Sequence, residues 1–152
     1  MIIALISSCS GEDGINGIDG VEGPAGLDGN ANVTSVLLEN ISFVAGDKDL
    51  SVTELTQDIL DNGVVIGYLR NSGESTWFAL PLSFGGFELF IQSIQLGSVT
   101  IRSNYVGNGT DFRFVLIEAN KSANNSSVFT DLKEAGVDIN NFNEVMDYYG
   151  LN

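Results

Sequence analysis

The sequence predicts an all-β domain, an antiparallel β-sandwich or small barrel, with a short C-terminal α-helix and an extended collagen-like G-X-Y segment before it. Three patterns predict this: glycine at every third position before residue 32, short apolar runs between turn residues after it, and an apolar stripe of helical period near the C-terminus. The 152 residues are 43% hydrophobic, which suits one globular domain with an appendage. We therefore divide the chain into residues 1–9, 10–31 and 32–152.

The first segment, residues 1–9, is apolar and then rich in small residues, which is the order found at the end of an export signal. Ile6-Ser7-Ser8-Cys9 resembles a bacterial lipobox, in which an aliphatic residue and two small residues precede a cysteine that becomes lipidated. The apolar run is short and no basic residue precedes it, so we expect a remnant of a longer lipoprotein signal peptide. Because Cys9 is the single cysteine, a disulfide within one chain is excluded. The alternative is an N-terminus in which this cysteine occurs by chance.

The second segment, residues 10–31, contains seven consecutive G-X-Y triplets. Strict period-three glycine is typical of a collagen triple helix, because only glycine fits where three polyproline-II strands meet. Such a segment would hold the following domain away from the surface in which Cys9 is anchored. The glycines of the repeat are Gly11, Gly14, Gly17, Gly20, Gly23, Gly26 and Gly29.

The composition of the triplets favours a monomeric spacer over a homotrimer. Pro24 is the one imino acid in the repeat, whereas collagen-like sequences are rich in proline. A trimer would also bring many carboxylates together with no cation to neutralise them. A single chain in extended form would span about 65 Å. The acidic residues of the repeat are Glu12, Asp13, Asp19, Glu22 and Asp28.

The third segment, residues 32–152, is predicted to form the β domain, because apolar and β-branched runs recur between turn residues. The runs over 64–69 and 112–117 are apolar nearly throughout, whereas a strand with one solvated face alternates. We therefore expect these two to be central strands or strands covered on both faces. The predicted strands cover residues 33–44, 52–55, 64–69, 76–82, 87–96, 99–105 and 112–117, with turns at 46–47, 62–63, 71–73, 85–86, 97 and 107–109.

A helix is predicted at about residues 140–149, and it could cover one of these strands. Asn140 or Asn141 can cap its start, and Gly150 can end it. A short helical turn is also indicated at residues 56–61. The apolar stripe of the C-terminal helix consists of Phe142, Val145, Met146 and Tyr149.

The composition excludes several functions. The chain has no histidine, which removes imidazole bases and Ser-His triads, and its formal net charge of -14 argues against nucleic-acid binding. No cofactor, metal site or catalytic residue is predicted. An enzyme would have to use carboxylates, as a glycoside hydrolase does, and Glu88 and Glu118 are the acids most embedded in apolar sequence. An outward strand face explains both residues equally well.

Aromatic residues provide another alternative, a carbohydrate-binding module. Trp77 with Phe78, and Phe84 with Phe87 and Phe90, could form a platform for sugar rings, although aromatics at strand spacing more often belong to a core. Trp77 is therefore the candidate ligand contact.

Taken together, these motifs resemble the collagen-like lipoproteins common in Bacteroidota. The resemblance rests on Cys9, the acidic triplets that close with Gly-Asn-Ala-Asn-Val, the strand at 61–69, the Trp77…Leu80-Pro81 step, the strand at 112–117 and the terminal helix. It covers essentially the whole chain, and it implies an exported, lipid-anchored, all-β protein. Ser10-Gly11-Glu12-Asp13 is also similar to the short acidic signal that sends such lipoproteins to the cell surface.

We therefore expect a non-enzymatic protein of the outer membrane or cell surface, held to the membrane through lipid on Cys9. It would display a β-sandwich on an acidic collagen-like stalk in a structural or adhesive role. Carbohydrate binding near Trp77 is the alternative, and a carboxylate-based glycoside hydrolase is the remote one. No residue pattern names a glycan or protein partner.

Overall fold

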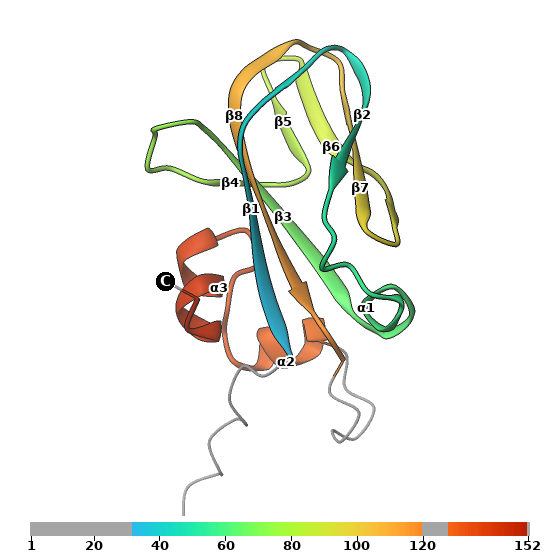
Figure 1. Cartoon of the computed structure of the whole chain (residues 1–152). Coiled ribbons are helices and arrows are strands. Elements are labelled where there is room, and N and C mark those ends of the chain that lie inside the picture. The colour runs from blue at the N-terminus through green and yellow to red at the C-terminus, as the bar shows by residue number, and fades with distance from the viewer. Residues whose placement is uncertain (1–31, 120–127, 152) are drawn as a thin grey trace, which may run out of the picture.

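The computed structural model describes residues 32–119 and 128–151, and it is mostly β-structure in two four-stranded antiparallel sheets (Figure 1). In what we call the β8 sheet the order is β1 (Val33–Phe43), β8 (Gly107–Ile117), β3 (Val64–Asn71) and β4 (Phe78–Ala79). In the β7 sheet the order is β2 (Gly46–Ser51), β7 (Ser98–Ser103), β6 (Phe87–Gln95) and β5 (Leu82–Phe84). The predicted fold class, mostly β with antiparallel sheets and short helices, is confirmed for these residues.

The two sheets pack against each other in a sandwich-like arrangement. Phe112, Phe114 and Leu116 alternate along β8 and lie on its inner face, in one apolar cluster with Val99 and Ile101 of the β7 sheet. Alternation of this kind follows from the two-residue period of a strand, which sends every second side chain to the same face. The inner face of the β8 sheet is therefore the main core.

The outer face of the β8 sheet is covered by two helices, α2 (Val128–Glu134) and α3 (Phe142–Tyr149) (Figure 1). Val115 and Ile117 of β8 pack there with Ile66 and Tyr68 of β3. Strands β3 and β8 are thus buried on both faces, which is why their sequences are apolar nearly throughout. The prediction that these strands are central and that the C-terminal helix covers them is confirmed.

The ends of the helices follow local capping chemistry. The Asn141 side chain accepts a hydrogen bond from the Glu144 N–H at the start of α3, and Gly150 ends the helix with a left-handed φ of 62°. Helix α1 (Gln57–Asn62) is capped by the Thr56 hydroxyl, which accepts from the Ile59 N–H. Both predicted helices are confirmed, whereas α2 was missed, because only Val128 and Leu132 of its residues are buried.

Two strand predictions and two turn predictions were wrong in whole or in part. The predicted strand at 52–55 lies in a turn, and the predicted turn at 46–47 begins the edge strand β2, whose residues are exposed except for Leu50. The predicted turn at 107–109 belongs to β8, where a Cβ atom on Gly107 would collide with the Phe43 ring. Of the predicted strand at 76–82, two residues form β4, and β5 begins at Leu82. Exposed edge strands carry little apolar signal, and glycine in a packed strand resembles glycine in a turn.

Candidate functional site

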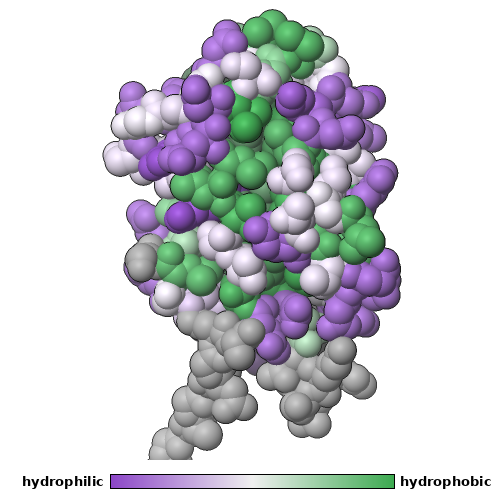
Figure 2. Space-filling view, in the orientation of Figure 1, coloured by the Kyte–Doolittle hydropathy of each residue, from purple (hydrophilic) through white to green (hydrophobic). Residues whose placement is uncertain are grey.

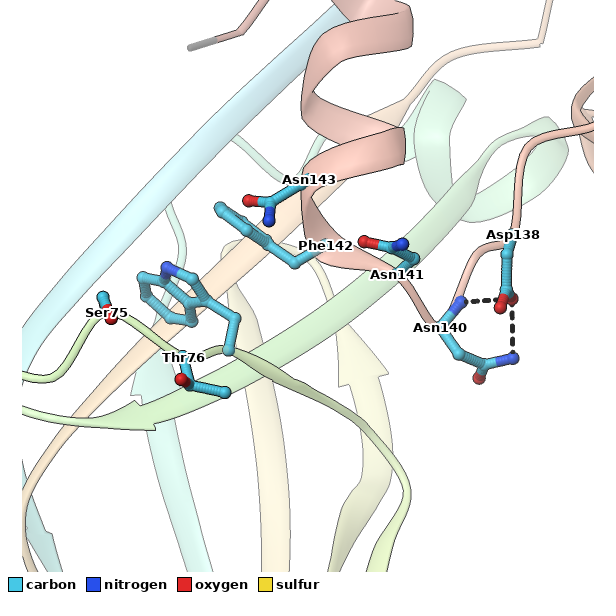
Figure 3. A pocket seen from close by; sticks show the side chains of 8 residues that line it. Ser75, Thr76, Asp138, Asn140, Asn141, Phe142 and Asn143 are labelled. Atoms are coloured by element: carbon cyan, nitrogen blue, oxygen red, sulfur yellow. Dashed lines mark hydrogen bonds between the residues drawn. The ribbon is translucent and has the colours of Figure 1, made fainter.

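A hollow on the surface of the described residues, which we call the Trp77 hollow, has a volume of about 670 Å³. It lies between the loop before β4 and the loop that leads into α3 (Figure 3). Both loops lie at the border of the helix layer on the outer face of the β8 sheet. The hollow is lined by Ser75, Thr76, Trp77, Asp138, Asn140, Asn141, Phe142 and Asn143.

Trp77, the ligand contact predicted from the sequence, lies on this hollow and is partly buried. Its indole stacks on the Phe142 ring, with 4.9 Å between centroids and 27° between planes. The guanidinium carbon of Arg70 lies 4.5 Å from the centroid of the same indole. Trp77 therefore joins α3 to the sheet, and the indole surface left to a ligand is smaller than that of a fully exposed platform.

The other aromatic residues of the predicted platform do not gather around Trp77. Phe78 pairs with Leu69, whose side chain belongs to the inner core, so Phe78 and Trp77 occupy alternate faces. Phe84 and Phe87 pair with each other across the β5–β6 turn of the other sheet. Phe142, which the sequence placed in an apolar helix stripe, is the ring that Trp77 contacts.

The polar side of the Trp77 hollow is held in shape by hydrogen bonds. Asp138 accepts from the backbone N–H and the side-chain amide of Asn140, at 2.9 and 3.0 Å (Figure 3). Glu144 accepts from the Asp138 N–H at 2.9 Å and from the Asn141 amide at 2.7 Å. The Tyr68 hydroxyl donates to the Ile139 carbonyl at 2.7 Å, which ties this loop to β3. Burial, with a smaller contribution from the Asp138 charge, raises the pKa of Tyr68 far above its usual range, so it remains a donor.

A charged group adjoins the aromatic pair. Asp111, which is 2% exposed, accepts from the Ser72 hydroxyl, the Asn40 N–H and the Arg70 guanidinium, the last at 2.9 Å. These contacts, the Ser72 hydrogen bond first, outweigh desolvation and hold the pKa of Asp111 below its usual range. Arg113 lies beside them, and burial, followed by the Arg70 charge, lowers its pKa. Arg113 was not predicted as a site residue. The indication in the sequence was its position as the one charged residue in the apolar run 112–117.

In the described part of the chain, this arrangement presents polar groups and one edge of an aromatic ring to a ligand. Phe142 stacks on one face of the Trp77 indole and the Arg70 guanidinium lies over the ring, so a sugar would meet the edge of the indole beside exposed hydroxyl and amide groups. Within residues 32–119 and 128–151, no three side chains of His, Cys, Asp or Glu are grouped as metal ligands.

The two carboxylates singled out from the sequence, Glu88 and Glu118, are not brought together. Glu88 lies at the start of β6, next to Asn104, whose side chain accepts from the Glu88 N–H at 2.9 Å. Glu118 follows the last residue of β8, and its N–H donates to the Asn32 carbonyl at the opposite end of the domain. A glycosidase pair requires separations of about 5–10 Å, so these two residues do not form one.

A second surface feature, which we call the apolar tip, was not predicted from the sequence. Val44 and Val106 lie in the β1–β2 and β7–β8 connections, and Phe84 and Phe87 flank the β5–β6 turn; their exposures are 67%, 60%, 78% and 54%. The β1–β8 and β2–β7 pairings place these three connections at one end of the sandwich. Figure 2 shows hydrophobic surface at this upper end. Clustered exposed apolar residues mark interaction surfaces more often than scattered ones do.

The predicted lipidation residue Cys9 and the repeat glycines Gly11 to Gly29 lie outside the described residues. Among the helices that the structure describes, none combines the length and apolarity needed to cross a bilayer. Comparisons with protein-family models, curated proteins and solved structures found no match to this chain.

Proposed function

We propose that the protein is a non-enzymatic, exported lipoprotein that displays its β domain for adhesive or structural contact. The observation that carries this proposal is the position of the apolar tip. Strand β1 begins at Val33 and runs 11 residues to Phe43, directly before Val44 of the tip. Its length is about 35 Å. The chain therefore enters the domain at the end opposite the tip.

This geometry supports the role of each predicted segment. An anchor at Cys9 and a spacer over residues 10–31 would join the domain at Val33, so the tip would face away from the bilayer. The repeated negative charges of the spacer would keep it extended by self-repulsion. An outward-facing apolar end is suited to contact with an apolar partner surface.

Adhesion measurements test the proposed contact. Cells that display the full-length protein should bind an apolar surface, and replacing both Phe84 and Phe87 by Ser should reduce the number of bound cells several-fold. Phe129→Ser is the matched control, because Phe129 is 48% exposed on α2, away from the tip. Equal adhesion of the wild type and the double variant would contradict the proposal.

The spacer is proposed to act as a monomer. Measurement of the solution mass with and without residues 10–31 should give a monomer in both cases. A trimer that requires the triplets would instead support a collagen-like stalk.

The Trp77 hollow favours a second candidate, recognition of a glycan. Trp77, which is backed by the buried Phe142 ring, supplies the aromatic edge, while Ser75, Thr76 and Asn143 supply exposed polar groups. Oligosaccharides added to the full chain should change the fluorescence of Trp77, which is the single tryptophan. Thr76→Val with Asn143→Ala should weaken that response, whereas Asn104→Ala at the far end of the molecule should not.

A further inference from the structure

The outer face of the β8 sheet holds two of the six basic residues of the chain, Arg70 and Arg113. Arg70 is neutralised by the buried carboxylate of Asp111. Arg113 is different: among residues 32–119 and 128–151, none of the ion pairs or hydrogen bonds involves its guanidinium. One positive charge in this cluster is therefore left uncompensated in a chain whose net charge is strongly negative.

Arg113 is held in an environment that makes this charge costly. Its guanidinium carbon lies 5.8 Å from the Trp77 ring centroid and 5.6 Å from that of Phe142. Its Nε atom is buried without a hydrogen-bond partner in the described part of the chain, while the side chain as a whole is partly exposed. A buried donor without a partner costs free energy, so this atom requires a partner such as a water, an ion or a ligand group.

A second unpartnered atom lies on the same face. The Ser35 hydroxyl is the other buried side-chain polar atom, within the described ranges, that has no partner. In the β1–β8 register Ser35 pairs with Val115 and Leu37 pairs with Arg113, so Ser35 and Arg113 are diagonal neighbours. Strand β1 lies on the side of β8 away from β3 and β4, so Ser35 lies on the far side of Arg113 from Trp77. Arg113 is therefore the unsatisfied group that adjoins the Trp77 hollow, through its contacts with two of the rings that line it.

We propose that the Arg113 guanidinium binds the carboxylate of an acidic saccharide whose sugar rings occupy the Trp77 hollow. This inference rests on the glycan candidate above. A carboxylate matches the forked donors of arginine and supplies the missing negative charge. The partly exposed Trp77 and the neutral amide and hydroxyl groups beside it suit the hydroxyl-bearing rings of a sugar rather than a simple anion.

The charge distribution also orients the ligand. Asp138 lies on the side of the hollow away from Ser75 and Thr76, which directly precede Trp77 in the chain (Figure 3), so it would repel an acid there and accept from sugar hydroxyls instead. Arg113 lies against the Trp77 and Phe142 rings. The acidic group of the ligand is therefore directed toward the aromatic end, and its hydroxyl groups toward Asp138 and Asn140.

Trp77 fluorescence tests this assignment, because the one tryptophan of the chain contacts the site. The full chain, carrying Cys9→Ala to prevent lipidation, is titrated with trigalacturonate and with its neutral methyl ester at low salt. We expect the acid to bind at least tenfold more tightly, with the difference shrinking as salt is added. Arg113→Gln should remove the preference, whereas Arg102→Gln, which alters an exposed arginine paired with Asp47 on the other sheet, should retain it.

Each other outcome contradicts part of the proposal. Equal binding of the acid and the ester by the wild type overturns the role of Arg113 and leaves the glycan candidate standing. Binding of neither ligand overturns both. A folded Arg113→Gln protein that still prefers the acid also overturns the assignment. If the wild type binds acetate as tightly as trigalacturonate, the ligand of Arg113 is a simple anion and the saccharide assignment is wrong. The comparison of acid with ester in the wild type requires no variant, so it decides the question even if Arg113→Gln fails to fold.

Discussion

The two faces of the β8 sheet are both covered, but they differ in the chemistry of what they bury. The inner face presents Phe112, Phe114 and Leu116 to the second sheet, with no charged side chain in that cluster. The outer face is apolar under the helices and then changes, along the same strand, to Arg113 and Asp111. The inner face stabilises the fold, while the outer face combines stability with a polar, cationic site.

The largest effect is expected on the inner face. Replacing the fully buried Phe114 by Ala should lower the free energy of unfolding by about 4 kcal/mol, because it leaves a cavity between the sheets. Leu37→Ala, at a position 36% exposed on the outer face, should cost less than about 1 kcal/mol. Chemical denaturation of the full chain measures both values. Similar losses for the two variants would mean that the inner face is not the main core.

A smaller but still large effect is expected where α3 covers the outer face. Met146→Ala removes a fully buried side chain from the helix and should cost about 3 kcal/mol. Amide hydrogen exchange should show the loss of protection concentrated in α3, because the inner core does not depend on Met146. Phe129→Ala on α2 is the exposed control. Uniform loss of protection across both sheets would contradict the separation of the two faces.

The smallest of the three effects is expected at the charged end of the outer face. Asp111→Asn weakens the hydrogen bonds from Ser72, Asn40 and Arg70, and should cost about 2 kcal/mol at neutral pH. Since the pKa of Asp111 is depressed in the folded state, its contribution is present above its ordinary pKa of 3.8 and is lost as the pH falls through the lower folded value.

Unfolding curves measured at several pH values test this sign. The stabilities of the wild type and Asp111→Asn should differ most at neutral pH and converge in acid. Asp47→Asn, at an exposed ion pair on the other sheet, should change little. A difference that grows toward low pH would contradict the assignment of the depressed pKa.

The elements that could be predicted from the sequence are those whose buried faces consist of apolar side chains in a regular pattern. Strands β3 and β8 are apolar on both faces, and α3 carries both a buried stripe and its caps, so each was found. Edge strand β2 is mostly exposed and α2 buries only two residues, so neither shows the apolar periodicity that predicts a strand or a helix. Trp77 could be identified by residue type, but its stacking on Phe142 depends on where α3 docks.

The cationic part of the site depended on strand register, which the sequence does not display. Arg113 and Trp77 are far apart in the chain, and the β3–β8 and β3–β4 pairings bring them together. The apolar tip likewise brings together three separate connections. Both features arise from tertiary contacts between segments that are individually unremarkable.

The central claim, that the domain is held at a membrane through Cys9, is tested most directly by cell fractionation. The protein is expressed from its gene with the upstream sequence, as the wild type and as Cys9→Ala. The wild type should fractionate with membranes and should be digested by protease added to intact cells, whereas Cys9→Ala should be recovered in the soluble fraction. Membrane fractionation of the Cys9→Ala variant equal to that of the wild type would contradict the account.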